Sequence, residues 1–145
     1  MVAKKSLASQ FHIDSCGTGG GNPGWYQEGG WSYHEGDRAD SRMRAAASKR
    51  GIDITSLSRA LTAEDVDKFD LLVCMDGANK SAVMEAADYW GKTSVAASKI
   101  RLMTEYCTIN KGARMVPDPY YGGADGFDKV LDLLEDACEG LLASM

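Results

Sequence analysis

The sequence has few of the residues that build metal centres. Its 145 residues include only two histidines and four cysteines. The cysteines are far apart and show none of the paired spacings that zinc sites use; they are Cys16, Cys74, Cys107 and Cys138. We therefore expect no metal and no other cofactor, and we expect a cytoplasmic protein with reduced thiols.

Basic residues and long apolar runs are also scarce. The 16 Lys and Arg are outnumbered by 21 Asp and Glu, which gives a net charge of −5. This balance argues against a nucleic-acid partner. No apolar run approaches the ~18 residues of a membrane span, so we expect no membrane partner. The largest basic cluster, Arg42-Met43-Arg44 with Lys49-Arg50, is interpreted as the solvated face of a helix.

The residues that are present predict a single α/β domain over residues 1–145. With 44% hydrophobic residues the chain can bury a core. Alternating apolar and polar residues predict a strand at Phe11–Ser15, and an apolar run predicts a strand covered on both faces at Phe69–Asp76. A weaker strand is expected at Lys99–Met103. Strands separated by helices indicate a layered sandwich with a largely parallel sheet.

Helical patterns lie between and after these strands. Asp40 is a predicted N-cap for a helix that stops at Gly51, and Thr62 opens a capping box with Asp65. Another helix is expected over residues 78–89, and residues 2–10 are interpreted as the end of one. The last helix has the clearest amphipathic pattern, with apolar positions at Phe127, Val130, Leu131, Leu134, Cys138, Leu141 and Leu142.

A glycine-rich segment, residues 16–36, separates the first strand from the first well-marked helix. It has glycines at 19 to 21 and at 29 and 30, and its aromatic residues are Trp25, Tyr26, Trp31 and Tyr33. Long irregular segments often carry function. The aromatic residues are therefore either a binding rim or the contacts that pack the segment onto the domain.

Proline is rare, and two of the three prolines flank one carboxylate in the stretch Val116-Pro117-Asp118-Pro119-Tyr120-Tyr121. Each proline fixes its own φ and restricts the residue before it. A rigid loop that presents Asp118 beside two phenol rings suits general acid–base chemistry on an aromatic substrate. The alternative is a turn that leads into the last helix.

Several segments together resemble the low-molecular-weight protein tyrosine phosphatases, most closely the plant or algal members. They are Ile13-Asp14-Ser15-Cys16-Gly17-Thr18, Tyr33-His34-Glu35-Gly36, Asp40-Ser41-Arg42, Phe69-Asp70, Cys74-Met75-Asp76 and residues 116–122. The resemblance runs from about residue 10 to the end of the chain. It implies a three-layer sandwich of the phosphotyrosine phosphatase I type.

The resemblance also implies a reaction and a set of roles. Family members hydrolyse phosphotyrosine monoesters through a cysteinyl-phosphate intermediate, so the implied partner is a phosphotyrosine protein or a small aryl phosphate. Asp118 corresponds to the general acid and base. The resemblance therefore favours a catalytic role for Asp118 over a simple turn. Tyr33, Tyr120 and Tyr121 correspond to walls of the substrate cleft.

One family feature is missing from this sequence. The nucleophile loop reads Cys, five residues, then Arg, but the residues six positions after Cys16, Cys74 and Cys107 are Asn, Lys and Ala, and no Arg follows Cys138. Lys80 after Cys74 cannot supply the bidentate fork of arginine. We therefore expect a chain that starts inside the family's first helix, without the first, central strand and the phosphate loop.

This departure leaves several functional interpretations open. The chain is either an N-terminally truncated phosphatase, inactive as it stands, or a phosphatase-like binding or regulatory domain. An arsenate reductase is a third alternative, but it needs the same missing loop. Without the central strand, exposed strand edges would favour self-association, and an organelle-targeting segment could precede residue 1.

Overall fold

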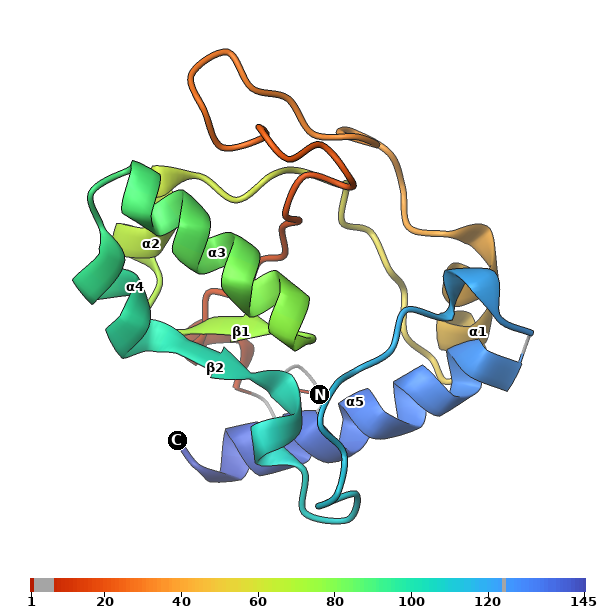
Figure 1. The fold of residues 1–145 in the computed structure, drawn as a ribbon. Helices are drawn as coiled ribbons and strands as arrows, with labels where there is room; N and C mark the ends of the chain where they lie inside the picture. The colour runs from red at the N-terminus through yellow and green to blue at the C-terminus, as the bar shows by residue number, and fades with distance from the viewer. Residues whose placement is uncertain (2–6, 124) are drawn as a thin grey trace.

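A computed structural model describes residues 1, 7–123 and 125–145 (Figure 1). Its sheet consists of β1 (Leu72–Cys74) and β2 (Ile100–Leu102), paired in parallel with Leu72 opposite Ile100. Parallel pairing across an intervening helical crossover confirms the predicted α/β class. The expected strand at 99–103 is confirmed, whereas the one at 69–76 is reduced to three residues, the length of its partner.

Helices cover both faces of this strand pair. On one face lie α2 (Ala63–Lys68), α3 (Gly77–Tyr89) and α4 (Thr93–Lys99), and on the other lies α5 (Asp125–Ala143) (Figure 1). Leu72 and Cys74 belong to the first core cluster, while Val73 packs against the second, to which α5 contributes Val130 and Ala137. Alternate residues of one strand thus serve two helical layers, and the predicted three-layer arrangement is confirmed.

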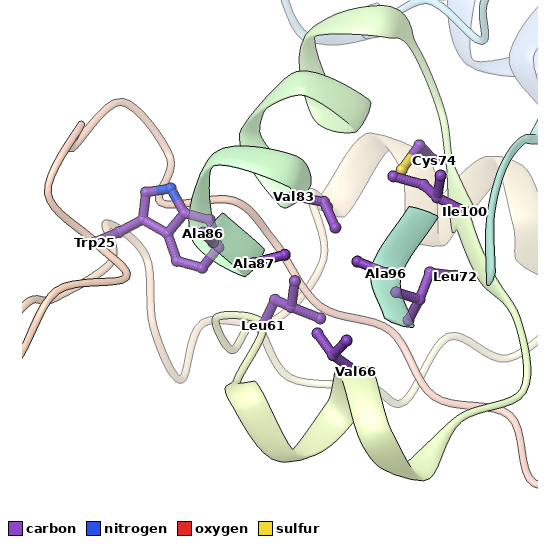
Figure 2. Close-up of a cluster of buried hydrophobic side chains, with 10 residues drawn as sticks. All are labelled: Trp25, Leu61, Val66, Leu72, Cys74, Val83, Ala86, Ala87, Ala96 and Ile100. Atoms are coloured by element: carbon purple, nitrogen blue, oxygen red, sulfur yellow. The ribbon is translucent and has the colours of Figure 1, made fainter. Parts of the chain in front are cut away.

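The first core cluster contains small residues on α3 and a tryptophan from the glycine-rich segment (Figure 2). Trp25 is 7% exposed and lies against α3 beside Ala86. Its indole ring meets the Trp90 ring edge-on at a centroid distance of 6.2 Å. For Trp25, the packing alternative for the aromatic residues of this segment is therefore correct.

Local capping signals gave the helix starts correctly. Asp40 accepts a hydrogen bond from the Arg42 N–H and begins α1 (Ser41–Ser48), after which Gly51 adopts a φ of 74°. Thr62 and Asp65 form the predicted capping box of α2. Asp76 caps α3 by accepting from the Asn79 N–H. Each of these signals depends only on residues within one turn of the helix.

Two N-terminal predictions fare differently. Residues 2–6 of the expected helix end lie outside the described residues, and Ala8–Gln10 form a 3₁₀ turn, η1. The predicted strand at Phe11–Ser15 is wrong: this segment has no strand assignment, and Ile13 is 68% exposed. Only Gly17, just beyond it, makes a single parallel bridge, to Ala60. A strand gains stability only from neighbours that take up its hydrogen bonds.

We expect rapid amide exchange along the edge of β1 that faces away from β2. Within the described part of the chain β1 pairs with β2 alone. The amide of Val73 in β1 should therefore exchange faster than that of Leu131 in the interior of α5, as should the amides of Leu71 and Ile13, which have no strand assignment. Hydrogen exchange measured by NMR, in a sample shown by light scattering to be monomeric, tests this. Equal protection of Val73 and Leu131 would contradict an open edge.

Candidate active site

The proline-flanked loop is anchored at the carboxyl end of β1. Val116 is buried, and its N–H donates to the carbonyl of Met75, one residue beyond the strand, at 2.7 Å. Asp118 then begins a 3₁₀ turn, η3 (Pro119–Tyr121), and its Oδ1 accepts from the Tyr120 N–H at 3.0 Å. The carboxyl ends of parallel strands are where α/β sheets place their ligand sites.

Asp118 and Tyr120 line one pocket of about 200 Å³ between this loop, α1 and α5. Both side chains are exposed to solvent, Tyr120 to 55%. The remaining lining residues are mostly apolar or belong to the α1 cap: Ala39, Asp40, Met43, Pro119 and Phe127. An exposed carboxylate beside a phenol ring and an apolar wall can hold an aromatic group next to a proton donor.

The structure does not bring Tyr33 into this pocket. Tyr33 lies in the glycine-rich segment, 48% exposed, with its ring edge-on to Trp31 at 4.6 Å. Its N–H donates to the carbonyl of Gly19 at 3.1 Å, which folds the segment back on itself. The side chain of Tyr121 lies outside the described part of the structure. The predicted roles of Asp118, Tyr33, Tyr120 and Tyr121 stay predictions.

The interpretation of the basic cluster as a solvated helix face is wrong for Arg50, and Arg42, although exposed, also makes contacts across the domain. The Arg42 guanidinium lies 4.8 Å from the Phe127 ring centroid and donates from Nη2 to the carbonyl of Tyr120 at 3.1 Å. The Arg50 side chain, 22% exposed, forms ion pairs with three acidic residues of α5, namely Asp128, Asp132 and Glu135. Both arginines tie the region of α1 to the C-terminal part of the chain. In the sequence, the contribution of Arg42 was indicated only by the family motif Asp40-Ser41-Arg42.

All four thiols are held in the protonated form. Desolvation raises the pKa of each cysteine, that of Cys74 to about 11. Cys74 is 5% exposed in the first core cluster, which agrees with its place in the strand predicted to be covered on both faces, and Cys138 packs against the second cluster, as its place on the apolar face of the last helix predicted. A thiol nucleophile needs a lowered pKa, so the environment of these cysteines does not favour nucleophilic catalysis.

Comparison with known proteins decides the family. The sequence model for low molecular weight phosphotyrosine protein phosphatases matches residues 1–145. The chain belongs to this family. A Synechocystis protein named as a low molecular weight protein-tyrosine-phosphatase is 38% identical over 144 residues, covering 99% of this chain and 81% of the relative. The enzyme named likewise in Streptomyces coelicolor is 35% identical over 145 residues, which cover 99% of this chain and 79% of that protein.

Solved structures agree with the family assignment. The protein tyrosine phosphatase from Entamoeba histolytica superimposes with a TM-score of 0.80 at 37% identity, over 98% of this chain and 80% of that one. YfkJ from Bacillus subtilis does so with a TM-score of 0.78 at 28% identity, over 99% and 78%. The chain thus spans about four fifths of these family members.

The residues that the structure describes contain no helix that is both long and apolar enough to cross a membrane. They contain no group of three or more His, Cys, Asp or Glu side chains placed to hold a metal ion.

Proposed function

We propose that residues 117–122 form the proton-donating side of an aryl-phosphate site, with Asp118 as general acid and base and Tyr120 as an aromatic wall. The observation that carries this proposal is the pocket shared by Asp118, Tyr120 and Phe127 at the carboxyl end of β1. A phenolate leaves far more readily once it is protonated, and a positioned acid contributes about 10²–10⁴-fold to the rate. The proposed substrate class is a phosphotyrosine protein or a small aryl phosphate, with Tyr33 and Tyr121 as further contacts.

We further propose that the 145-residue chain does not complete this reaction by itself. No cysteine in it is followed by an arginine at the sixth position, so the chain has no thiolate, backbone cradle and guanidinium arranged together for a phosphate. The raised thiol pKa values support the same conclusion, because none of the four cysteines is activated to replace the nucleophile.

We expect the 145-residue chain to hydrolyse p-nitrophenyl phosphate no faster than the uncatalysed background. Without a nucleophile the proton donor has no reaction to assist, and loss of the nucleophile removes most of the catalysis in enzymes that form a covalent intermediate. Release of p-nitrophenol, followed by the absorbance of its phenolate, measures this. Turnover that disappears in Asp118→Asn would refute the proposal of inactivity and imply a substitute nucleophile.

The role of Asp118 is tested in an extended chain. A strand, a loop that reads Cys, five residues, then Arg, and a helical turn are fused before residue 1. Asp118→Asn should then lower kcat about 10²–10⁴-fold while phosphate still binds. Asp37→Asn is the matched control, because that carboxylate is also exposed but does not line the pocket of Asp118. Unchanged turnover in Asp118→Asn would remove Asp118 from its role.

A phosphatase-like binding or regulatory domain is the second candidate. The protonated thiols and the exposed aromatic rings of Trp31, Tyr33 and Tyr120 favour it. The nucleotide sequence upstream of codon 1 discriminates between the two candidates: an in-frame Cys-x5-Arg segment there supports a catalytic protein. Self-association through the edge of β1 belongs to either candidate and is measured by light scattering over a concentration series.

A further inference from the structure

Arg42 joins two segments that are 78 residues apart in sequence and meet at the candidate active site. The residue lies in the first turn of α1, and its Nη2 donates to the carbonyl oxygen of Tyr120 at 3.1 Å. The same guanidinium lies 5.4 Å from the centroid of the Tyr120 ring and 4.8 Å from that of Phe127. It therefore contacts both aromatic walls of the pocket that Asp118 lines.

Asp40 fixes the direction of this guanidinium. Its carboxylate accepts from Arg42 Nε at 3.1 Å and from Nη2 at 2.9 Å, a two-point contact that a lysine could not reproduce. Asp40 also accepts from the backbone N–H of Arg42 at 2.8 Å as the N-cap of α1. The hydrogen bond from the Arg42 side chain is the main cause that lowers the pKa of Asp40. The fork is thus held by the same residue that starts the helix.

The backbone of Tyr120 connects Arg42 to the carboxylate of Asp118. Its carbonyl is held by Arg42, and its N–H donates to Asp118 Oδ1 at 3.0 Å. Arg42 and Asp118 are therefore bonded to the two sides of one residue. We propose that Arg42 is a positioning residue for the acid loop, which sets the orientation of Asp118 and of the Tyr120 ring through the backbone of Tyr120. Only the expected effect on catalysis rests on the proposed role of Asp118; the positioning of the loop does not.

Arg50 provides a matched comparison on the same side of the domain. It also reaches the C-terminal part of the chain, donating to the carbonyl of Asp128 at 3.1 Å and forming ion pairs along α5. Its side chain is less exposed than that of Arg42, 22% against 46%. Its hydrogen bonds and ion pairs reach α5, whereas those of Arg42 reach Asp40 and Tyr120. A merely stabilising arginine would thus behave like Arg50.

The test uses the 145-residue chain and backbone ¹⁵N relaxation, which needs no turnover. In Arg42→Gln the order parameters of the Tyr120 and Gly122 amides should fall from about 0.85 to below about 0.6, the change from rigid to flexible backbone. Arg42→Lys should show the same fall, because an ammonium group cannot hold Asp40 and Tyr120 together in a fork. Arg50→Gln should leave both amides unchanged while lowering the melting temperature.

Unchanged order parameters at Tyr120 in a folded Arg42→Gln or Arg42→Lys protein would overturn the proposal, as would an equal loss in Arg50→Gln. The extended, active chain separates this outcome from the proposed function. There Arg42→Gln should lower kcat about tenfold or more, because misplacement of a reacting group by ~1 Å can cost 10²-fold. If Asp118→Asn leaves kcat unchanged while Arg42→Gln still loosens Tyr120, the proposed function fails and the structural coupling stands.

Discussion

Replacing Gly140 with alanine should destabilise the protein, although the position lies inside the longest helix. A Cβ atom built at Gly140 would overlap the carbonyl oxygen of Tyr106 and lie 2.9 Å from its carbonyl carbon. Both atoms are backbone, so no side-chain rotation relieves the clash. Helix propensity alone predicts the opposite result, a gain of about 1 kcal/mol for Gly→Ala.

At this position the cost of the steric clash should exceed the gain in helix propensity. Overpacking of a tight contact costs about 1–3 kcal/mol or more, and here α5 must move away from the segment that contains η2 (Met103–Tyr106). Because the clash is with backbone, we expect the upper end of this cost, which after the propensity gain leaves a net loss of about 2 kcal/mol in the free energy of unfolding, measured by urea denaturation. The same movement would disturb Met103, Cys107 and Val116, which share a core cluster with α5. Val116 lies two residues before Asp118, so the acid loop should shift as well.

Gly126→Ala is the control for this experiment. Gly126 belongs to the same helix, and its added Cβ would be 3.6 Å from the Cβ of Pro119, an ordinary contact. This variant should be as stable as the unmodified chain or more stable. If Gly140→Ala behaves like Gly126→Ala, the close approach of α5 to Tyr106 does not exist in solution.

Features encoded within a few residues were predictable from the sequence. The caps Asp40, Thr62 and Asp76 act on backbone N–H groups two or three residues away, and the apolar spacing of the last helix directly reflects the face that it buries. A strand depends instead on a neighbouring strand that accepts its hydrogen bonds, and the local sequence pattern does not identify that neighbour. This explains why Phe11–Ser15, with its clear alternation, is not a strand, and why the strand at 69–76 is limited to three residues. α4 was missed because Lys92 provides no side-chain cap.

The candidate site also contains features that the local sequence predicts and features that it does not. The two prolines identified the loop of Asp118, and the family resemblance supplied the role expected of Asp118. The contribution of Arg42 could not be predicted from periodicity, because its partners Tyr120 and Phe127 come from distant parts of the chain. The family assignment depends on no single residue, because the family model matches residues 1–145 and the Synechocystis relative is 38% identical over 144 residues.

Replacing Asp136 with asparagine should also cause a large loss of stability. Asp136 is 6% exposed on α5, and its carboxylate accepts from the backbone N–H groups of Thr108, Ile109 and Asn110 at 2.9, 3.1 and 2.7 Å. It also accepts from the Asn110 side-chain amide at 3.0 Å. Both carboxylate oxygens thus face donors. An asparagine would present its own NH₂ group to some of these donors and leave them unsatisfied.

The matched control is Asp132→Asn, one turn earlier on the same helix. The Asp132 side chain is 67% exposed, and its ion pair with Arg50 lies at the surface, where such pairs contribute little. We expect Asp136→Asn to lower the melting temperature by several degrees more than Asp132→Asn, measured by circular dichroism at pH 7. Equal losses in the two variants would mean that the segment 108–110 is not held by Asp136.

The pH dependence of this loss identifies its electrostatic origin. The Asn110 backbone N–H, followed by the N–H groups of Thr108 and Ile109, holds the pKa of Asp136 well below its usual range despite the opposing effect of burial. A carboxyl group whose pKa is lower in the folded state stabilises the fold above the pKa of the unfolded chain, about 3.9, and loses this contribution as the pH falls further. The stability difference between the unmodified chain and Asp136→Asn should therefore be constant from about pH 5 to 7 and shrink below about pH 4. If the stability difference instead stays constant down to about pH 2, the loss comes from altered packing and not from the charge of Asp136. Ordinary carboxyl groups, with a pKa of about 4, are fully protonated at that pH.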